Sequence, residues 1–398
     1  MHRVNAKRRQ TSTRAGRYIR QPTRYQAFVP APFPPVDLKI EPSLVTLLER
    51  ATLAVGRLVG SADILPDPDL FVTMYVRREA VLSTQIEGTQ ASLVDLLKYE
   101  AEDAEAERRV DVAEVSNYVE ALRYGLKRVK ELPLSLRLVC EIHGKLMIGV
   151  RGGESGKTPG EFRRSQNWIG GPSPQTARYV PPPVTEMKRA LGEFEKFLHA
   201  ETDMPILLKV GLAHAQFETI HPFLDGNGRM GRLLITFLLA HGGILHEPLL
   251  YLSIFFKRHR QEYYDRLQAV RDKGDWEDWL ALFLEGVADV AEEATDTAGK
   301  IVRLRETKRT QIANEFGRRS RSALRLLESL FRQPYVTVRT VRRTTDLSQP
   351  AANALVNAME QAGILREVTG RRRSRIFQFH EYMSLFEERA ERNVEVSP

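Results

Sequence analysis

The sequence has few of the features that mark secreted or membrane proteins. Among its 398 residues only Cys140 is a cysteine, so no internal disulfide can form and one thiol cannot build a metal site alone. The most apolar stretch, residues 233–240, has eight residues and includes Thr236, whereas a membrane-spanning helix needs about 18. No apolar segment follows the basic start, as a secretory signal would require. These absences predict a cytoplasmic protein that does not enter a membrane.

Acidic residues are missing from one part of the chain and in excess in another. Residues 1–36 contain eight Lys and Arg but no Asp or Glu, and residues 301–398 contain 19 basic against 11 acidic residues. Because the whole chain has a formal net charge of +8, residues 37–300 carry −8. Basic ends on an acidic body favour an anionic partner such as a nucleic acid, although a basic tail can also serve solubility alone.

Hydrophobic spacing predicts a mainly α fold with two different ends. Apolar residues recur every three to four positions through the body, which is the period of an amphipathic helix. Prolines punctuate the N-terminal segment and favour an extended chain there. The predicted units are an extended basic arm at 1–36, a helical region at 37–129, a second helical region at 130–286, a helical connector at 287–318, a C-terminal module at 319–385 and a tail at 386–398.

The body is expected to be helical except for one loop-rich stretch. Helices are predicted from residue 43 and at 70–84, 91–109, 110–126, 136–150, 184–199, 206–220, 230–240, 255–273 and 276–286. Residues 151–183 are rich in Gly, Pro, Ser and Asn, and short alternating pieces around Trp168 and Tyr179 predict a small β-hairpin or flap. Four aromatic or aliphatic residues beside the central loop are expected in the core: Phe217, Phe223, Leu233 and Leu234.

The C-terminal module has the pattern of a winged helix. Helices are predicted at 322–331, 338–345 and 349–363, followed by strands at 364–368 and 376–379 that flank the basic turn 370–375. The third of these helices contains no Lys or Arg, so affinity for phosphates would come from Arg342, Arg343 and the arginines of the turn. DNA and protein are equally expected as partners of this module.

The most informative stretch is HPFLDGNGRMGR, residues 221–232, which lies between two apolar helices. Gly226 and Gly228 permit backbone conformations that a Cβ atom would forbid, so successive N–H groups can turn towards one anion. The first turn of the following helix adds unpaired N–H groups and a favourable dipole. The backbone of this loop therefore predicts a phosphate site.

The side chains of the same stretch add reactive groups. His221 is a base with a pKa near working pH, and Asp225 offers a hard oxygen to Mg²⁺, which commonly binds one or two carboxylates together with substrate phosphates. Arg229 and Arg232 are three residues apart on one helix face, where they can grip phosphate oxygens. Together these groups suit attack by a hydroxyl on a nucleotide phosphate.

This stretch resembles the signature of Fic-domain proteins, in which His, one residue, Phe, one residue, Asp or Glu, Gly-Asn-Gly-Arg, two residues and Arg follow each other. The resemblance implies a Fic-type helical bundle with its catalytic core at 130–286. It also implies protein adenylylation, in which AMP passes from ATP to a Ser, Thr or Tyr hydroxyl of a target protein or of the chain itself, and pyrophosphate is released.

Family roles transfer by position onto this stretch. His221 would deprotonate the target hydroxyl and Asp225 would hold Mg²⁺. The positions that would bind ATP are Gly226, Asn227, Gly228, Arg229, Met230, Gly231 and Arg232. Further positions are implied less directly: Tyr264 would pack on the adenine, Thr219 would line the nucleotide pocket, and Arg271 stands where the family often has an Asn.

A second local pattern, Ser83-Thr84-Gln85-Ile86-Glu87-Gly88, resembles the inhibitory helix found N-terminally in one class of Fic proteins. In a helix Ser83 and Glu87 share a face, and Gly88 ends the turn. The resemblance implies that Glu87 bonds Arg232 and occupies space that the γ-phosphate of ATP needs. It further implies that the flap residues Trp168, Ile169 and Gly170 dock a target segment by β-augmentation.

Several alternatives remain open on the sequence alone. The chain could be a winged-helix DNA-binding regulator whose Fic body senses a nucleotide, or a Fic-fold enzyme that removes AMP. A zinc site at His214, Glu218 and His221 is disfavoured because the Glu is not next to the first His, as zincins require. Gly156-Lys157-Thr158 resembles the end of a Walker motif but is assigned to the loop that leads to the flap. The oligomeric state stays open on the sequence, and the family resemblance makes a homodimer one of the alternatives.

Overall fold

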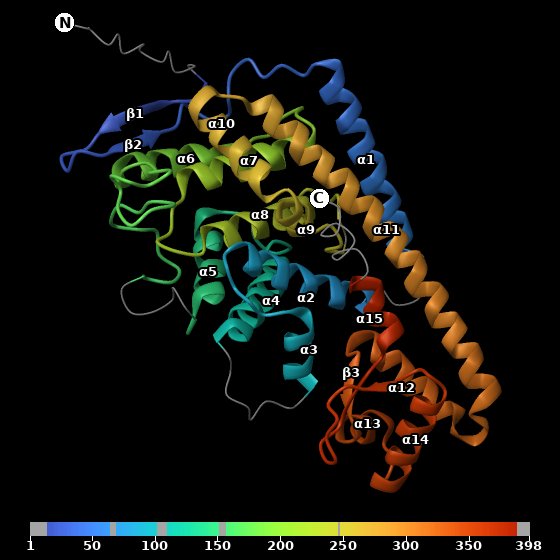
Figure 1. Cartoon of the computed structure of the whole chain (residues 1–398). Coiled ribbons are helices and arrows are strands. Elements are labelled where there is room, and N and C mark those ends of the chain that lie inside the picture. The colour runs from blue at the N-terminus through green and yellow to red at the C-terminus, as the bar shows by residue number, and fades with distance from the viewer. Residues whose placement is uncertain (1–13, 64–68, 102–109, 151–156, 246, 388–398) are drawn as a thin grey trace, which may run out of the picture.

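The computed structural model describes residues 14–63, 69–101, 110–150, 157–245 and 247–387. Helices dominate these ranges, which confirms the mainly α fold, and short strands lie near both ends (Figure 1). The body helices are α1 (Pro42–Asp63), α2 (Asp69–Ile86), α3 (Leu93–Ala101), α4 (Val110–Arg128), α5 (Leu136–Met147), α6 (Val184–His199), α7 (Ile206–Ile220), α8 (Asn227–His241), α9 (Ser253–Arg258), α10 (Arg260–Lys273) and α11 (Trp276–Glu315). No helix in the described ranges is long and apolar enough to cross a bilayer.

The pair α7 and α8 forms the centre of the body. Nearly all their side chains are buried, since α6, α10 and α11 pack on α7 while α2, α4 and α5 pack on α8. A helix that is apolar on all sides needs this kind of enclosure. The predicted core residues Phe217, Phe223, Leu233 and Leu234 are all buried, as expected. The loop between α7 and α8 is therefore held on a rigid scaffold.

The long helix α11 replaces two predicted elements. A helix at 276–286 and a connector from 287 were expected, but the structure has one continuous helix of 40 residues. It lies beside α1 and runs on to the C-terminal module (Figure 1). Gly286 lies within α11 without interrupting it. The glycine makes room for the Phe255 ring, because a Cβ at this position would lie 2.7 Å from that ring.

The predicted N-terminal arm is wrong for residues 14–36, because this segment folds back onto the body. Strands β1 (Arg17–Arg20) and β2 (Gln26–Val29) form an antiparallel hairpin. Phe28 is buried in β2, and its N–H donates to the Val180 carbonyl at 2.9 Å. Arg14 forms an ion pair with Glu277 of α11 at 2.8 Å. The remainder of the arm, residues 1–13, lies outside the described residues.

The C-terminal module has the predicted winged-helix order. Its elements are α12 (Ser320–Arg332), β3 (Tyr335–Thr337), α13 (Val338–Thr345), α14 (Gln349–Gln361), β4 (Arg366–Glu367), β5 (Ile376–Gln378) and α15 (His380–Glu387). The strands form one antiparallel sheet in the order β3-β5-β4. Strand β3 was not predicted, since a strand of three residues gives little periodic signal. Helix α15 was not predicted either. The basic turn between β4 and β5 is the wing.

Other boundaries differ modestly from the predicted ones. The helix expected at 255–273 is divided at His259 into α9 and α10. The helix expected at 91–109 is observed as α3 over Leu93–Ala101, and the predicted part at 102–109 lies outside the described residues. The helix expected from residue 230 already begins at Asn227, so the second half of the signature is helical. The predicted tail, from residue 386, is described only as far as Glu387.

Candidate active site

The site lies where α7 ends and α8 begins. His221 caps the C-terminus of α7 with a left-handed backbone (φ 49°), and Gly226 caps the N-terminus of α8 with φ 74°. A Cβ on Gly226 would lie 2.6 Å from the Met147 sulfur. This position therefore needs glycine both for its left-handed backbone and for the lack of space for a side chain. The first-turn N–H groups of α8 have no acceptor within the helix. The signature loop therefore ends in a helix N-terminus, and anion binding by its backbone stays a prediction.

Asn227 holds the loop together with its side chain. Its Oδ1 accepts from the Phe223 N–H at 2.8 Å, and its Nδ2 donates to the Phe223 carbonyl, also at 2.8 Å. The predicted phosphate contact of Asn227 therefore falls to its backbone N–H, because both ends of the amide are already engaged. Met230 is buried in the core and contributes to the site only through the backbone.

His221 is presented as a neutral base. Its carbonyl accepts hydrogen bonds from Arg163 Nε at 3.0 Å and Asn167 Nδ2 at 3.3 Å, which fix the residue in its turn. Burial, followed by the charges of Arg271 and Arg163, lowers the pKa of the ring to about 3. The Nδ1 atom has no hydrogen-bond partner in the described structure and lies 3.9 Å from a Glu218 oxygen. The imidazole is therefore unprotonated at neutral pH. The expectation of a pKa near working pH is wrong for this structure, because burial and the two arginines disfavour the charged ring.

Asp225 carries the carboxylate that would hold a metal. Its Oδ1 accepts from the Gly226 N–H at 2.6 Å, and its Oδ2 lies 3.1 Å from the Lys157 ammonium. The side chain is 38% exposed, so phosphate oxygens can reach an ion beside it. Among the described residues no group of three or more His, Cys, Asp and Glu is placed to hold a metal ion. One exposed carboxylate fits Mg²⁺ that takes its remaining ligands from a nucleotide.

Glu87, Ser83 and Arg232 meet as the resemblance implied. Glu87 Oε1 lies 2.7 Å from Arg232 Nη2. Arg232 Nε donates to the Ser83 hydroxyl, and its Nη2 also donates to the Ser83 carbonyl, both at 2.8 Å. The guanidinium is buried, whereas Glu87 is 36% exposed. Gly88 follows with φ 100°, which ends α2 as predicted.

Gly228 has a different role from the predicted one. Its backbone is helical and shows no left-handed φ, so conformational freedom does not explain the glycine. A Cβ on Gly228 would lie 2.2 Å from Glu87 Oε1. Gly231 is similar, because its Cβ would lie 2.5 Å from Glu218 Oε1. Both glycines leave room for carboxylates that approach α8 from other helices.

Arg229 is buried beside two acids that the structure brings together. Its Nη2 lies 3.6 Å from Asp225 Oδ1, and its Nη1 lies 3.9 Å from Glu114 Oε2. The same Glu114 oxygen accepts from the Thr89 hydroxyl at 2.6 Å, two residues after Glu87. Glu114 was not predicted as a site residue. Its position between Val112 and Val115, on the apolar side of a helix, indicates a buried acid.

Tyr263 and Tyr264 differ in exposure, and the adenine contact of Tyr264 stays a prediction. Tyr263 is buried, and its hydroxyl is 2.9 Å from His214 Nε2. Tyr264 is only partly buried, with the Arg260 guanidinium 5.9 Å from its ring. Arg271 turns inwards, where its guanidinium lies 3.9 Å from the Tyr179 ring.

The flap is shorter than a full hairpin. Ile169 and Tyr179 form a single antiparallel bridge with two hydrogen bonds of 2.8 and 3.1 Å. The carbonyl of Gly170 accepts from the Arg178 N–H at 2.7 Å. Trp168 is 40% exposed beside this bridge. The Tyr179 hydroxyl donates to the carbonyl of Thr219 at 2.7 Å, so the flap is tied to the last turn of α7.

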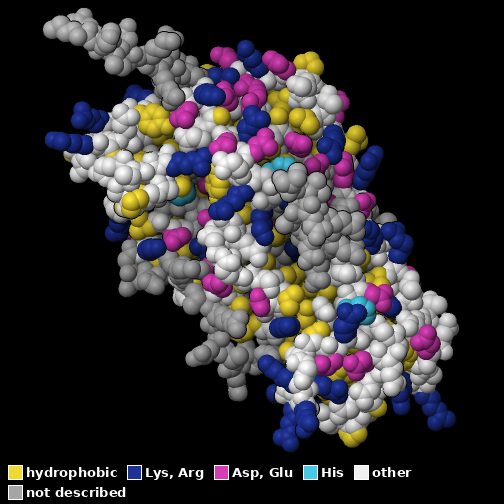
Figure 2. All heavy atoms as spheres, viewed as in Figure 1, with side chains coloured by type: hydrophobic (Ala, Val, Ile, Leu, Met, Phe, Trp, Pro, Cys, Tyr) yellow, Lys and Arg dark blue, Asp and Glu magenta, His cyan; other side chains and the backbone are white. Residues whose placement is uncertain are grey.

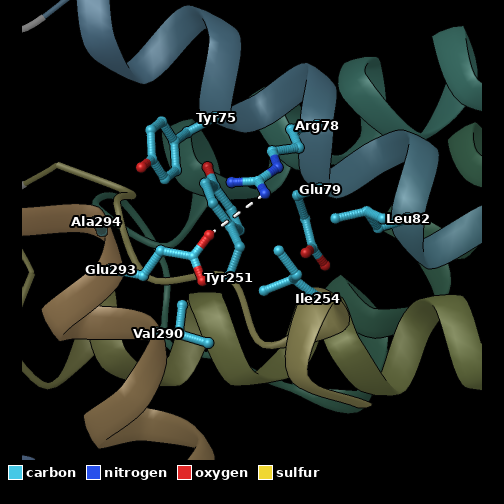
Figure 3. A pocket seen from close by; sticks show the side chains of 9 residues that line it. All are labelled: Tyr75, Arg78, Glu79, Leu82, Tyr251, Ile254, Val290, Glu293 and Ala294. Carbon is cyan, nitrogen blue, oxygen red and sulfur yellow. Dashed lines mark hydrogen bonds and ion pairs between the residues drawn. The ribbon is translucent and has the colours of Figure 1, made fainter. Parts of the chain in front are cut away.

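A buried carboxyl on α2, four residues before Ser83, ties this helix to α4 and α9. Glu79 accepts from the Tyr118 hydroxyl at 2.9 Å and the Ser253 hydroxyl at 2.6 Å, and burial raises its pKa to about 7. Figure 3 shows Glu79 beside a cavity of about 20 Å³, room for one water, between α2, α9 and α11. Tyr251 lines the same cavity with a buried hydroxyl that has no hydrogen-bond partner in the described structure.

Comparisons with known proteins cover both halves of this site. Residues 45–127 match the family described as Fic/DOC family N-terminal, and residues 133–239 match the Fic/DOC family. The protein adenylyltransferase Fic of Culex quinquefasciatus is 34% identical over 165 residues, which are 41% of this chain and 29% of that relative. The chain therefore spans under a third of the length of the curated relatives that it matches.

Two solved structures share the fold. A Fic family protein from Desulfovibrio desulfuricans G20 has a TM-score of 0.56 at 18% identity, covering 86% of this chain and 97% of that one. Fic-1 from C. elegans, residues 134–508, has a TM-score of 0.50 at 20% identity, covering 66% of this chain and 75% of that one. At these identities the likeness concerns the fold alone.

Proposed function

We propose that this protein, whose residues 45–127 and 133–239 match the Fic/DOC family, transfers AMP from ATP to a hydroxyl side chain of a protein. The acceptor would be a Ser, Thr or Tyr of a target or of the chain itself. Relatives named protein adenylyltransferase Fic support this activity. The observation that carries the proposal is the α7–α8 junction, where a neutral imidazole, an exposed carboxylate and a helix N-terminus meet.

His221 is suited to take the proton of the attacking hydroxyl. Its lowered pKa keeps the ring unprotonated, and Nδ1 is without a partner among the described residues. The hydroxyl oxygen bonds to the α-phosphorus while the bond from that phosphorus to the pyrophosphate oxygen breaks. The hydroxyl proton moves to His221, and pyrophosphate leaves. A placed general base contributes about 10²–10⁴-fold to such a step.

The α8 N-terminus and its arginines would hold the triphosphate. Backbone N–H groups of the first turn face the anion, and Arg229 and Arg232 lie in that helix. Asp225 would hold Mg²⁺ together with phosphate oxygens, and the ion would supply charge neutralisation. Tyr264 would border the base, and Trp168–Gly170 would receive a target segment along the flap. The side chain of Thr219 does not support its predicted place in the nucleotide pocket, because it is buried and lines a small cavity with Phe28 and Trp276.

Glu87 would inhibit the enzyme through Arg232. The 2.7 Å ion pair occupies the guanidinium that the γ-phosphate would otherwise bind. ATP would then bind with its α-phosphate out of line for attack. A buried arginine that has an acid partner and two bonds to Ser83 is also hard to redirect, because an unpaired buried charge is costly.

The test is incubation of the full chain with Mg²⁺ and ATP labelled at the α-phosphate. We expect weak self-labelling by wild type, stronger labelling by Glu87→Gly, and none by His221→Ala, which should still bind ATP. His241→Ala, at the exposed C-terminal end of the same helix, is the matched control and should label like wild type. Mass spectrometry would locate the AMP adduct.

Two results would contradict the proposal. Labelling by His221→Ala at the rate of the control would remove the general base from the mechanism. Glu87→Gly labelling at or below the wild-type level, in a folded protein, would remove the inhibitory role of Glu87.

A second candidate function is DNA-dependent regulation in which the Fic body senses a nucleotide. The observation that favours it is the wing, where Arg371, Arg372 and Arg373 are exposed together. Salt-sensitive DNA binding that survives His221→Ala, with no AMP transfer in any variant, would favour this reading.

Three further predictions accompany the proposed activity. Removal of AMP from a modified protein would use the same site, and loss of label from a purified adduct would reveal it. A homodimer is expected from the family resemblance and is checked by light scattering. We also expect the protein to act in the cytoplasm, in line with its single cysteine.

A further inference from the structure

Lys157 lies on the carboxylate that is assigned to the metal. Its Nζ is 3.1 Å from Asp225 Oδ2, and the two side chains are 48% and 38% exposed. The other oxygen, Oδ1, is engaged with the Gly226 N–H at 2.6 Å and faces Arg229 at 3.6 Å. Oδ2 is therefore the outward oxygen of Asp225, and a cation already occupies it.

His143 holds the segment that carries Lys157 next to Asp225 by two hydrogen bonds. The Gly160 N–H donates to His143 Nδ1 at 2.9 Å, and His143 Nε2 lies 3.0 Å from the Asp225 carbonyl. Because Nδ1 accepts, the proton is on Nε2, which donates to that carbonyl. The His143 ring also stacks on Phe223 with centroids 3.6 Å apart. His143 thus joins residues 157–160 to the signature loop.

We propose that Lys157 is the resident cation of Asp225: its ammonium neutralises the carboxylate before nucleotide arrives and must leave Oδ2 before a divalent ion binds there. In the nucleotide-bound enzyme the displaced ammonium pairs with the triphosphate. This inference rests on the proposed function, which assigns Asp225 to Mg²⁺. It makes Lys157 a positioning residue that couples metal binding to nucleotide binding.

The physical reason is competition for one oxygen. Mg²⁺ binds weakly to a single carboxylate and gains its other ligands from phosphates and water. An ammonium at 3.1 Å reduces the affinity for a lone metal ion further, both by blocking Oδ2 and by repulsion. A triphosphate adds negative charge and new oxygens, so the ammonium then has another partner. Binding of the metal ion together with the nucleotide is thereby favoured over binding of the metal ion alone.

The experiment uses Mn²⁺ as the probe, because the paramagnetic resonance signal of the free ion reports how much is bound. Full-length wild type, Lys157→Met and Asp225→Asn are titrated without nucleotide. We expect Lys157→Met to bind Mn²⁺ about two- to fivefold more tightly, the range that corresponds to an exposed ion pair. Lys188→Met, on the exposed face of α6, is the matched control and should equal wild type. Unchanged or weaker binding by Lys157→Met overturns the proposal.

A second titration includes a non-hydrolysable ATP analogue. We expect the gain from Lys157→Met to shrink or vanish, because the wild-type ammonium now pairs with phosphates. A gain of the same size with the analogue present overturns the transfer of Lys157 to the triphosphate. Thermal unfolding of each variant shows that it is folded under the conditions used.

These results separate the inference from the proposed function. A gain in Lys157→Met together with no AMP transfer in any variant supports the competition at Asp225 and contradicts the activity. Asp225→Asn made in the Lys157→Met background should abolish the gain in Mn²⁺ binding. A gain that persists in this double variant overturns the inference, since Asp225 would not be the metal ligand, whereas the labelling assay alone decides the AMP transfer.

Discussion

At the scale of single residues, the site is shaped by which groups approach α8 from other helices. Gly228 illustrates this, because its backbone is ordinary and the reason for glycine is Glu87 Oε1, 2.2 Å from where a Cβ would lie. The carboxylate reaches α8 from the end of α2, 140 residues earlier in the chain. The contact between Glu87 and Arg232 therefore depends on the absence of a side chain at position 228.

This relation predicts thermodynamic coupling between the two positions. Gly228→Ala should lower the free energy of unfolding by about 1–3 kcal/mol in wild type, the usual effect of overpacking, because Glu87 must leave Arg232. In the Glu87→Gly background the same change should be neutral or stabilising, since alanine favours a helix over glycine. Urea unfolding of the four proteins gives the coupling energy. Equal effects in both backgrounds would show that Glu87 does not face position 228.

Glu218 is a second residue whose environment sets its chemistry. Burial raises its pKa to about 7, opposed by the charge of Arg232, and its Oε1 has no hydrogen-bond partner in the described structure. In the unfolded chain a Glu titrates near pH 4.3. The folded protein therefore holds a proton on Glu218 that the unfolded chain releases, and stability falls as pH rises between these values.

Glu218→Gln should remove this pH dependence. The unfolding free energy of the variant relative to wild type should be higher at pH 8 than at pH 5.5, because only wild type must ionise a buried carboxyl. Urea unfolding at both pH values measures the difference. A difference that is constant with pH would mean that Glu218 titrates in the folded protein as it does in the unfolded chain.

At the scale of elements, the N-terminal hairpin supports the flap. Its strand β2 donates from Phe28 N to the Val180 carbonyl, and the Gln175 side chain of the flap donates to the Thr23 carbonyl in the hairpin turn at 3.0 Å. Phe28 also faces the Tyr179 ring at 6.1 Å between centroids. One edge of the flap is thus covered, and the proposed target segment would dock on the other edge, which carries Trp168 and Ile169.

Phe28→Ala tests this docking. The change should lower the free energy of unfolding by about 3–5 kcal/mol, as for other buried Phe residues, and should increase hydrogen exchange in residues 169–180. Tyr18→Phe keeps the neighbouring ring and removes only an exposed hydrogen bond to Asp272, so it serves as the control. A loss below about 1 kcal/mol with unchanged exchange would mean that the hairpin does not support the flap.

At the scale of the whole molecule, α2 joins the C-terminal module to the active site. Arg77 Nη1 donates to the Arg332 carbonyl at the end of α12, and Tyr75 contacts the Phe386 ring of α15 at 5.8 Å between centroids. The same helix carries Ser83 and leads to Glu87. A partner that moves the module would therefore act on the helix that leads to Glu87, the residue proposed to inhibit the enzyme.

The partner of the module is tested at the wing. Figure 2 shows Lys and Arg side chains on the lower part of the molecule, over the C-terminal module. In the wing, Arg371, Arg372 and Arg373 are exposed. Changing all three to Gln should weaken binding to duplex DNA. It should also reduce the slope of log affinity against log salt by about three, one for each phosphate contact. Binding with the same slope in wild type and variant would exclude the wing as the DNA contact, leaving protein docking for this surface.

Local sequence determined the features whose parts lie close together in the chain. Helical spacing predicted most of the body helices, because an amphipathic period shows within 11–18 residues. The signature at 221–232 holds a base, a carboxylate, three glycines and two arginines in twelve residues. Their assembly at one helix junction therefore followed from the sequence. Ser83 and Glu87 are four residues apart and needed only a helix to share a face.

Tertiary packing alone decided the contacts between distant segments. Lys157 meets Asp225 across 68 residues, and Arg163 meets His221 across 58. The docking of β2 on the flap and the reason for Gly228 belong to the same class. Periodicity reports which face of an element is apolar, but the partner of that face depends on how all elements share one core. From the sequence alone, residues 14–36 were therefore predicted as an extended arm and Lys157 as part of a loop. Only the tertiary structure shows that the first packs on the flap and that the second pairs with Asp225.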